Sequence, residues 1–181
     1  MSGGHDAADA VVIHVADPSL VALVGAAGSG KSTFAARHFA PDEILSSDAF
    51  RAAISGDAAD QSASPAAFKA LHAALGRRLR DRRLTVVDAT NLTTAARRAL
   101  VTRAAAAAIP AVAIVLDLPE AIVMARNAAR RDRVVPEEVV RRHLGEVGRI
   151  VADGSLVADG FGSVVTLTDP GEVDRVVVSR V

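Results

Sequence analysis

Residues 25–32 read GAAGSGKS and carry the spacing of a phosphate-binding loop, G-x-x-x-x-G-K-[ST]. Glycines let such a loop curl until successive N–H groups point at phosphate oxygens, and the start of the next helix adds partial positive charge. In this pattern Lys31 reaches the β- and γ-phosphates, and the Ser32 hydroxyl ligates Mg²⁺. The sequence therefore predicts a site for ATP or another NTP, formed by Gly28, Ser29, Gly30, Lys31, Ser32 and Thr33.

The segments on either side of this loop suit that use. Residues 20–24 are all apolar, which predicts a buried strand, and residues 33–37 favour a helix. Strand, loop and helix in this order are the context that the motif requires. Lys31 is also one of only two lysines among the 21 basic residues, so a lysine at this position fits a specific role.

A carboxylate and an arginine follow the next predicted strand, residues 43–46. Asp48 lies where an acceptor would face the γ-phosphate, and transfer to an alcohol requires a carboxylate within about 3 Å of the attacking hydroxyl. Arg51 comes three residues later, so on a helical turn both side chains share one face and the guanidinium could bind an acceptor phosphate. The alternative is that Asp48 is only a helix N-cap.

Asp88 ends another apolar segment, residues 84–88, which predicts a further strand. P-loop proteins place a carboxylate at this point, near Mg²⁺ or the water molecules around it. The same carboxylate could instead orient Arg51 on the acceptor side. For Asn91 the sequence leaves two alternatives, contact with the acceptor or a structural role in the turn after the strand.

Arginines gather in the sequence RNAARRDR, residues 126–133. Arg126 and Arg130 are four residues apart and share one face of a helix, and Arg133 follows just beyond. Arginines on a mobile segment can fold over the triphosphate and stabilise the charge of the transferring phosphoryl group. Since a proline soon restarts a helix, residues 126–143 predict a helix–turn–helix lid, with an exposed basic helix as the alternative for some of these arginines.

These residues depend on an alternation of strands and helices for their positions. The apolar pattern predicts strands at residues 11–15, 20–24, 43–46, 84–88, 111–117 and 163–167, and helices at about 64–82, 93–108, 119–130 and 136–150. Apolar strands that alternate with helices indicate an α/β fold, a parallel sheet with helices on both faces. The residues that follow strand ends then meet at the carboxyl edge of that sheet.

Composition narrows the class of protein. The 181 residues suit one domain and include no cysteine, which excludes a disulfide framework and a thiolate nucleophile or metal site. The five histidines show no metal-ligand spacing, and we assign none of them to catalysis. With no signal peptide and no apolar run of membrane-spanning length, we expect a cytoplasmic protein.

The formal net charge is zero, but the charges are segregated along the chain. Residues 61–150 carry 16 basic and 8 acidic side chains, while both flanking regions are acidic. Such segregation favours a polyanionic ligand, and solvated helix faces are the alternative explanation.

Four segments taken together resemble one family of kinases. GAAGSGKSTFA, SSDAFR, VVDATN and RNAARRDR, in this order and spacing, resemble the 5′-hydroxyl polynucleotide kinase domain of bacterial polynucleotide kinase-phosphatase enzymes of RNA repair. The resemblance extends over about residues 11–150. It implies a P-loop kinase fold with an arginine-rich helical lid, and Mg²⁺-dependent transfer of the γ-phosphate of ATP or another NTP to the 5′-OH end of RNA or DNA.

The resemblance also implies roles for individual residues. Lys31 would hold the donor phosphates, Asp48 would act as general base on the 5′-OH, and Arg51 would bind the neighbouring acceptor phosphate. Asp88 and Asn91 would support the acceptor side. The lid arginines, of which Arg130 would contact the β- and γ-phosphates, would be Arg126, Arg130 and Arg133.

In that family the kinase module is the N-terminal part of a longer protein that also carries phosphatase and ligase-like modules. The resemblance therefore implies that this chain is linked in cis to such modules. We expect a flexible N-terminus over residues 1–9, the P-loop kinase domain over residues 10–170, and the start of a linker over residues 171–181.

Three other functions share parts of this pattern. A small-molecule P-loop phosphotransferase for a sugar or an antibiotic has the same loop, lid and aspartate base, but a neutral acceptor gives Arg51 no phosphate to bind. A nucleotide-dependent switch would not need a carboxylate aimed at an acceptor, so substitution of Asp48 would leave its hydrolysis largely intact. A toxin-type kinase that acts on a nucleotide sugar shares the core of the fold.

Overall fold

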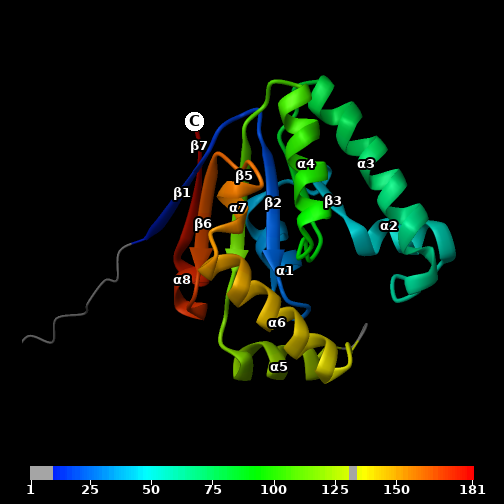
Figure 1. Cartoon of the computed structure of the whole chain (residues 1–181), viewed down its shortest axis with the longest axis vertical. Helices are drawn as coiled ribbons and strands as arrows, with labels where there is room; N and C mark the ends of the chain where they lie inside the picture. Colours follow the sequence, from blue (N-terminus) through cyan, green and yellow to red (C-terminus); the bar gives the residue numbers. More distant parts are fainter. Residues whose placement is uncertain (1–9, 131–133) are drawn as a thin grey trace, which may run out of the picture.

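The computed structural model describes residues 10–130 and 134–181, and at its centre is a five-stranded sheet in which all neighbouring strands are parallel (Figure 1). The strand order is β3-β4-β2-β5-β6. The strands are β2 (Leu20–Gly25), β3 (Ile44–Ser46), β4 (Thr85–Asp88), β5 (Ala111–Leu116) and β6 (Ser163–Leu167). Because β2 is the central strand, the phosphate-binding loop starts in the middle of the carboxyl edge.

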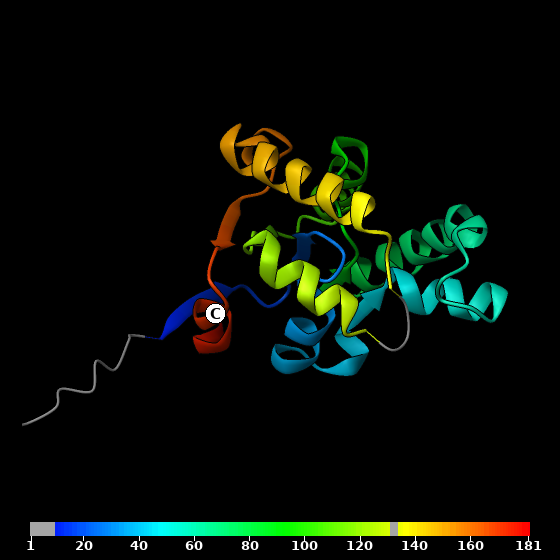
Figure 2. The same cartoon turned by 90° about the horizontal axis from the view of Figure 1, so that it is seen from below.

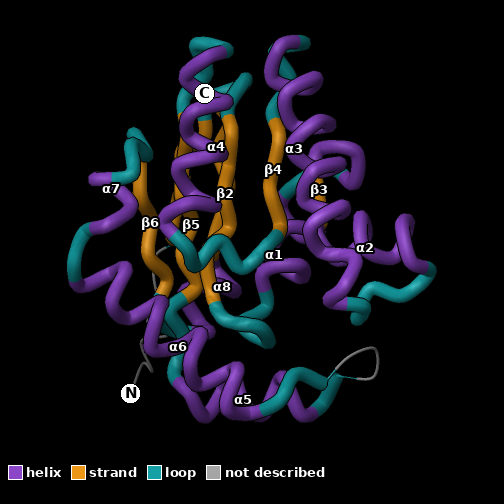
Figure 3. Tube along the Cα trace, turned by 45° about the vertical axis from the view of Figure 1, so that its right-hand side comes forward, coloured by secondary structure: helices purple, strands orange, loops and turns teal. Residues whose placement is uncertain are grey.

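Helices cover both faces of this sheet, as Figure 3 shows for α3 and α4 in front of the strands. One face packs through a buried apolar cluster against α3 (Ser64–Arg80), α4 (Thr94–Ala106), α6 (Glu137–Ala152) and α7 (Ser155–Ala158). The other face packs against α1 (Lys31–His38) and a second, two-stranded sheet. Every residue of β2 and β5 is buried, which is why these strands are continuous apolar runs in the sequence. The predicted α/β fold is confirmed.

The second sheet joins the two ends of the described chain. It pairs β1 (Val11–Val15) in parallel with β7 (Val176–Arg180), and α8 (Pro170–Arg175) leads into β7. The predicted first strand therefore exists but does not belong to the main sheet. Residues 171–181, which we expected to begin a linker, are folded onto the domain. Alternate valines of β7 form an apolar face that packs on the core, and β1 alone would leave that part of the core exposed.

A lid lies beyond the carboxyl edge of the sheet. Its helices are α5 (Glu120–Ala128) and the amino-terminal part of α6; seen from below in Figure 2, yellow-green α5 crosses the middle of the molecule. A third apolar cluster joins Ala26 of the phosphate-binding loop to the lid residues Val123, Val135 and Val140. Helix α2 (Ser47–Ser55) follows β3 without a gap, and 3₁₀ turns lie at Pro41–Glu43 and Gln61–Ala63.

The other predicted strands and helices are present, with ends that differ from prediction by a few residues. The sequence did not predict α7, α8 or β7. The expected flexible N-terminus, residues 1–9, lies outside the described residues. Within the described ranges, no helix is both long and apolar enough to cross a membrane.

Candidate active site

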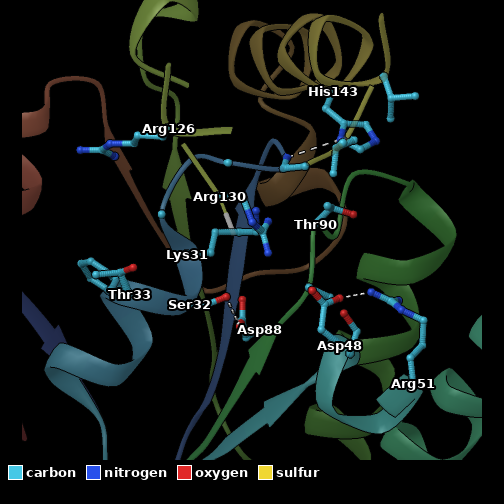
Figure 4. Close-up of a pocket in the computed structure, with 18 of the residues that line it drawn as sticks. Lys31, Ser32, Thr33, Asp48, Arg51, Asp88, Thr90, Arg126, Arg130 and His143 are labelled. Atoms are coloured by element: carbon cyan, nitrogen blue, oxygen red, sulfur yellow. Dashed lines mark hydrogen bonds and ion pairs between the residues drawn. The ribbon is translucent and has the colours of Figure 1, made fainter. Parts of the chain in front are cut away.

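A pocket of about 1120 Å³ opens at the carboxyl edge of the sheet (Figure 4). Its walls come from the phosphate-binding loop, α1, α2, α3, α8, the segment after β4, and both lid helices. The predicted site residues that line it are Gly28, Gly30, Lys31, Ser32, Thr33, Asp48, Arg51, Asp88, Arg126 and Arg130. Residues far apart in the sequence therefore meet in one place, as expected for strand ends on one edge of a parallel sheet.

Two glycines give the phosphate-binding loop its shape. Gly28 and Gly30 have φ values of +84° and +97°, in the region that disfavours residues with a side chain. A Cβ at Gly28 would lie 3.0 Å from the carbonyl oxygen of Val123 and 3.1 Å from Cβ of Asn127, both on α5. The loop is therefore packed directly against the lid.

Lys31 is buried at the start of α1 and bound to the loop itself. Its ammonium donates hydrogen bonds to the carbonyl oxygens of Gly25, at 3.0 Å, and Ala26, at 2.7 Å. Burial lowers the pKa of Lys31 to about 8; the nearby Asp88 carboxylate opposes this shift, and Arg130 adds to it. A triphosphate would add its negative charge to that of Asp88 beside this buried ammonium.

Ser32 and Asp88 bring a hydroxyl oxygen and a carboxylate together in the pocket. The Ser32 hydroxyl donates a hydrogen bond of 2.7 Å to Oδ2 of Asp88, and Asp88 is only 6% exposed. One hydroxyl and one carboxylate fit Mg²⁺, which binds few protein oxygens and completes its shell with water and substrate phosphates. No cluster of three or more His, Cys, Asp or Glu side chains able to hold a metal occurs in the described residues. Of the two roles left open for Asp88, the structure places it beside the loop serine.

Asp48 and Arg51 lie on the opposite wall of the pocket (Figure 4). The N-cap of α2 is Ser46, whose hydroxyl accepts the N–H of Ala49 at 3.4 Å, so Asp48 is free of that structural role. Arg51 donates to the Asp48 carboxylate and, through Nε, to the carbonyl oxygen of Ala58 at 2.8 Å. Arg51 is buried, whereas 42% of the Asp48 side chain is exposed. The Asp48 carboxylate thus lies at the pocket, and the Arg51 guanidinium beside it is held in place by its bond to Ala58.

The lid contributes two of its predicted arginines to the pocket. Nη1 of Arg126 donates to the carbonyl oxygen of Ser29 at 3.1 Å, and Arg130 points toward the space between Lys31 and Thr90 (Figure 4). Arg133 lies outside the described residues.

Asn91 corrects one expectation. Its side chain is buried and does not line the pocket, and its amide donates to the carbonyl oxygens of Leu23, at 2.8 Å, and Ala89, at 3.4 Å. These bonds hold the turn after β4 against β2. In that turn Asn91 itself has a φ of +51°. Ser29 is likewise buried inside the loop.

Several further lining residues were not among the predicted site residues. His143 of α6 accepts the N–H of Ala27 through Nδ1 at 3.5 Å, a contact across 116 residues that no spacing could indicate. Arg37 and Asp174 form an ion pair of 3.0 Å at another part of the pocket, and Phe68 of α3 also lines it. Of these residues, Phe68 comes from α3, which carries none of the four motifs.

Comparisons with known proteins place this fold among P-loop kinases. The family model AAA_33, described as an AAA domain, matches residues 20–149, and no curated protein matches the sequence. A chain of the Pnkp1/Rnl/Hen1 RNA repair complex is similar with a TM-score of 0.64 and 22% identity, over 84% of this chain and 49% of that chain. This chain therefore spans about half the length of that relative.

Two other solved structures are similar at lower TM-scores. A gluconokinase from Sinorhizobium meliloti 1021 has a TM-score of 0.54 and 19% identity, over 89% of this chain and 90% of that chain. The AvrRxo1-ORF1:-ORF2 structure with ATP has a TM-score of 0.55 and 17% identity, over 78% and 53%. At these identities the likeness concerns the fold.

Fold, pocket and family model agree on the class of fold, a P-loop fold of the kind that kinases have. Since the family model matches well over half of the sequence, the chain belongs to the AAA_33 family of AAA domains.

Proposed function

We propose that this protein transfers the γ-phosphate of ATP or another NTP to the 5′-OH end of an RNA or DNA strand, as in the healing of broken nucleic acids. The observation that carries the proposal is the Asp48–Arg51 pair on the pocket wall across from Lys31. A carboxylate there can accept a proton from an alcohol, and the adjacent guanidinium suits an alcohol that carries a phosphate nearby.

The donor half of the pocket would hold the triphosphate. Loop N–H groups and the Lys31 ammonium would bind its phosphate oxygens, and Arg126 and Arg130 would cover them from the lid. Ser32 and Asp88 would hold Mg²⁺, which when bound neutralises the charge of the β- and γ-phosphates. Each of these side chains lines the pocket.

The acceptor half would carry out the proton transfer. Asp48 takes the proton of the 5′-OH while that oxygen forms a bond to the γ-phosphorus, and the bond from phosphorus to the β–γ bridging oxygen breaks. The products are a 5′-phosphate end and a nucleoside diphosphate, and Asp48 then returns its proton to water. Arg51 would keep its bond to Ala58 and turn one nitrogen from Asp48 to the acceptor phosphate, which frees the carboxylate to act as base.

The main alternative is a small-molecule kinase, since a gluconokinase has a similar fold. The burial of Arg51 favours an anionic acceptor, such as a polynucleotide end or gluconate, over a neutral sugar. A buried guanidinium at a substrate pocket is costly unless an anion pairs with it, and a neutral sugar cannot replace Asp48 in that role. A nucleotide end carries that anion within reach of the attacking hydroxyl.

We further infer that the kinase acts together with other repair modules, phosphatase-like and ligase-like, linked in cis. The similar chain in the Pnkp1/Rnl/Hen1 RNA repair complex is about twice as long as the matched region, which supports such an arrangement.

The proposal is tested by transfer of labelled γ-phosphate, with Mg²⁺, to matched oligonucleotides that end in 5′-OH or 5′-phosphate, beside gluconate and a neutral sugar. We expect label on the 5′-OH strand alone. Asp48→Ala and Asp48→Asn should each lower kcat by about 10²–10⁴-fold, and Arg51→Ala should mainly raise KM for the oligonucleotide.

The exposed Asp153 at the end of α6 provides the control, because Asp153→Asn changes charge equally but lies away from the pocket. Label on a sugar but on neither oligonucleotide would replace the polynucleotide with a small alcohol. Hydrolysis that persists in Asp48→Ala, without any transfer, would indicate a nucleotide switch.

A further inference from the structure

Two arginines of the pocket, Arg37 and Arg142, take no part in the chemistry described so far, and they differ in their partners. The arginines that line the pocket are Arg37, Arg51, Arg126, Arg130 and Arg142. Arg37 pairs with Asp174, Arg51 with Asp48, and Arg126 binds the carbonyl oxygen of Ser29. Arg142 is exposed on α6, and within the described ranges no carboxylate pairs with it.

The neighbouring arginine on α6 shows the contrast. Arg141 pairs with Glu120 at 3.0 Å and with Glu137 at 3.2 Å, and it does not line the pocket. Successive residues of a helix point about 100° apart, so one arginine braces the two lid helices while the next faces the pocket. Val139, one turn before Arg142, and His143, the next residue along α6, line the same pocket.

The position of α6 puts this face on the acceptor side. His143 contacts the N–H of Ala27 and in Figure 4 lies above Thr90, on the side of the loop where Asp48 lies. Figure 2 shows the yellow amino-terminal end of α6 on the same side of the molecule as α2 and α3, drawn in cyan and teal. Phe68 and Ser64 of α3 line the pocket as well.

Charge in this part of the pocket favours a polyanion. The carboxylates that line the pocket are Asp48, Asp88 and Asp174, and each is already bound to another lining residue. Nothing acidic in the described lining therefore neutralises Arg142. A nucleic acid strand carries a phosphate at every nucleotide, about 3.4 Å of rise apart, so a strand with its end at Asp48 brings further phosphates past this wall.

We propose that Arg142 binds a phosphodiester of the acceptor strand beyond the terminal phosphate assigned to Arg51, and so makes the pocket selective for polynucleotides over mononucleotides. This inference rests on the proposed function, because it takes Asp48 as the place where the 5′-OH end lies.

The test compares Arg142→Ala with Arg141→Ala as a matched control on the same helix. Binding is measured by fluorescence anisotropy with a labelled 5′-OH 12-mer, and transfer is measured with that 12-mer and with a nucleoside 3′-monophosphate. Arg142→Ala should weaken 12-mer binding about five- to tenfold, the scale of one charge-assisted contact, with a much smaller effect on KM for the monophosphate. Arg141→Ala should match the wild type in 12-mer binding, because the ion pairs that it removes are solvent-exposed and contribute little.

The salt dependence of 12-mer binding distinguishes a phosphate contact from a structural role of Arg142, because a purely structural role would leave it unchanged. The slope of log Kd against log salt concentration should fall by about 0.7 in Arg142→Ala, as for the loss of one phosphate contact to a single strand. Equal binding by the two variants, equal losses for 12-mer and monophosphate, or a raised KM for the NTP alone would overturn the inference. If the wild type binds the 12-mer but transfers no phosphate, the proposed function fails while the binding comparison still decides the role of Arg142.

Discussion

At the scale of single residues, Lys31 shows how a site can be prepared for a charged ligand. Its ammonium is buried and is held by two carbonyl oxygens of its own loop, which do not compensate a full positive charge. Its pKa is consequently lowered to about 8. A bound triphosphate would reverse this effect, because four negative charges nearby favour the protonated amine.

Nucleotide affinity should therefore depend on pH in an unusual range for a lysine. As pH rises through about 8, free Lys31 loses its proton, and binding must then include proton uptake. We expect Kd for the NTP to rise about five- to sixfold between pH 8 and pH 9. Calorimetry in buffers of different ionisation enthalpy should show more proton uptake at pH 9 than at pH 7. Lys31→Met should bind weakly and without this dependence; a constant affinity from pH 7 to pH 9 in the wild type would contradict the prediction.

At the scale of secondary-structure elements, the phosphate-binding loop and the lid are packed as one unit. Gly28 lies against α5, and Asn127 of α5 exchanges hydrogen bonds with the backbone of Val135, at 2.8 and 3.1 Å, on the far side of the lid turn. Val123 and Val135 share an apolar cluster with Ala26 of the loop. Changes in the loop should therefore reach the lid directly.

Gly28→Ala tests this coupling against Gly56→Ala. Both glycines have positive φ, +84° and +80°, but a Cβ at Gly56 meets nothing within 4 Å whereas one at Gly28 meets α5. We expect a loss in unfolding free energy of about 1–2 kcal/mol for Gly56→Ala and about 2–4 kcal/mol for Gly28→Ala, because overpacking adds to the backbone cost. Chemical denaturation measures both. Only Gly28→Ala should raise KM for the NTP, and equal effects of the two variants would exclude the coupling.

At the scale of the whole molecule, the two ends of the described chain pair with each other as strands and cover part of the core. β1 and β7 pair over five residues, and their inward side chains join the core on the face of the main sheet that α1 also covers. The last strand is thus part of the hydrophobic core although it comes after every motif of the site. Its removal would uncover residues such as Ile13 and Val15, which are almost fully buried.

Two neighbouring valines of β7 test whether this segment is integral to the domain. Val176 is 5% exposed and faces the core, whereas Val177 is 51% exposed on the other face. Val176→Ala should lower the unfolding free energy by about 2 kcal/mol, from lost burial and a small cavity, and Val177→Ala should change it by less than about 0.5 kcal/mol. Denaturant titration distinguishes them. Equal, negligible effects would mean that residues 171–181 behave as a linker in solution.

The sequence by itself determined the α/β fold and predicted the loop at the end of its central strand. Both depend on local patterns: continuous apolar runs for buried parallel strands, and a loop whose spacing suits phosphate over eight consecutive residues. It also indicated that Asp48, Arg51 and Asp88 meet, because strand ends share one edge of the sheet.

Tertiary structure alone decided which side chains face the pocket and which support it. Asp88 ends β4 and Asn91 comes soon after it. The side-chain amide of Asn91 donates a hydrogen bond to the backbone of β2, whereas Asp88 lines the pocket beside Ser32. Three further features depend on segments that are far apart in the chain. They are the contact between His143 and Ala27, the pairing of Arg141 with Glu120 while Arg142 lines the pocket, and the pairing of β7 with β1. Such contacts are fixed by how whole helices and strands pack against one another, and packing between distant segments leaves no periodic pattern in the sequence of either one.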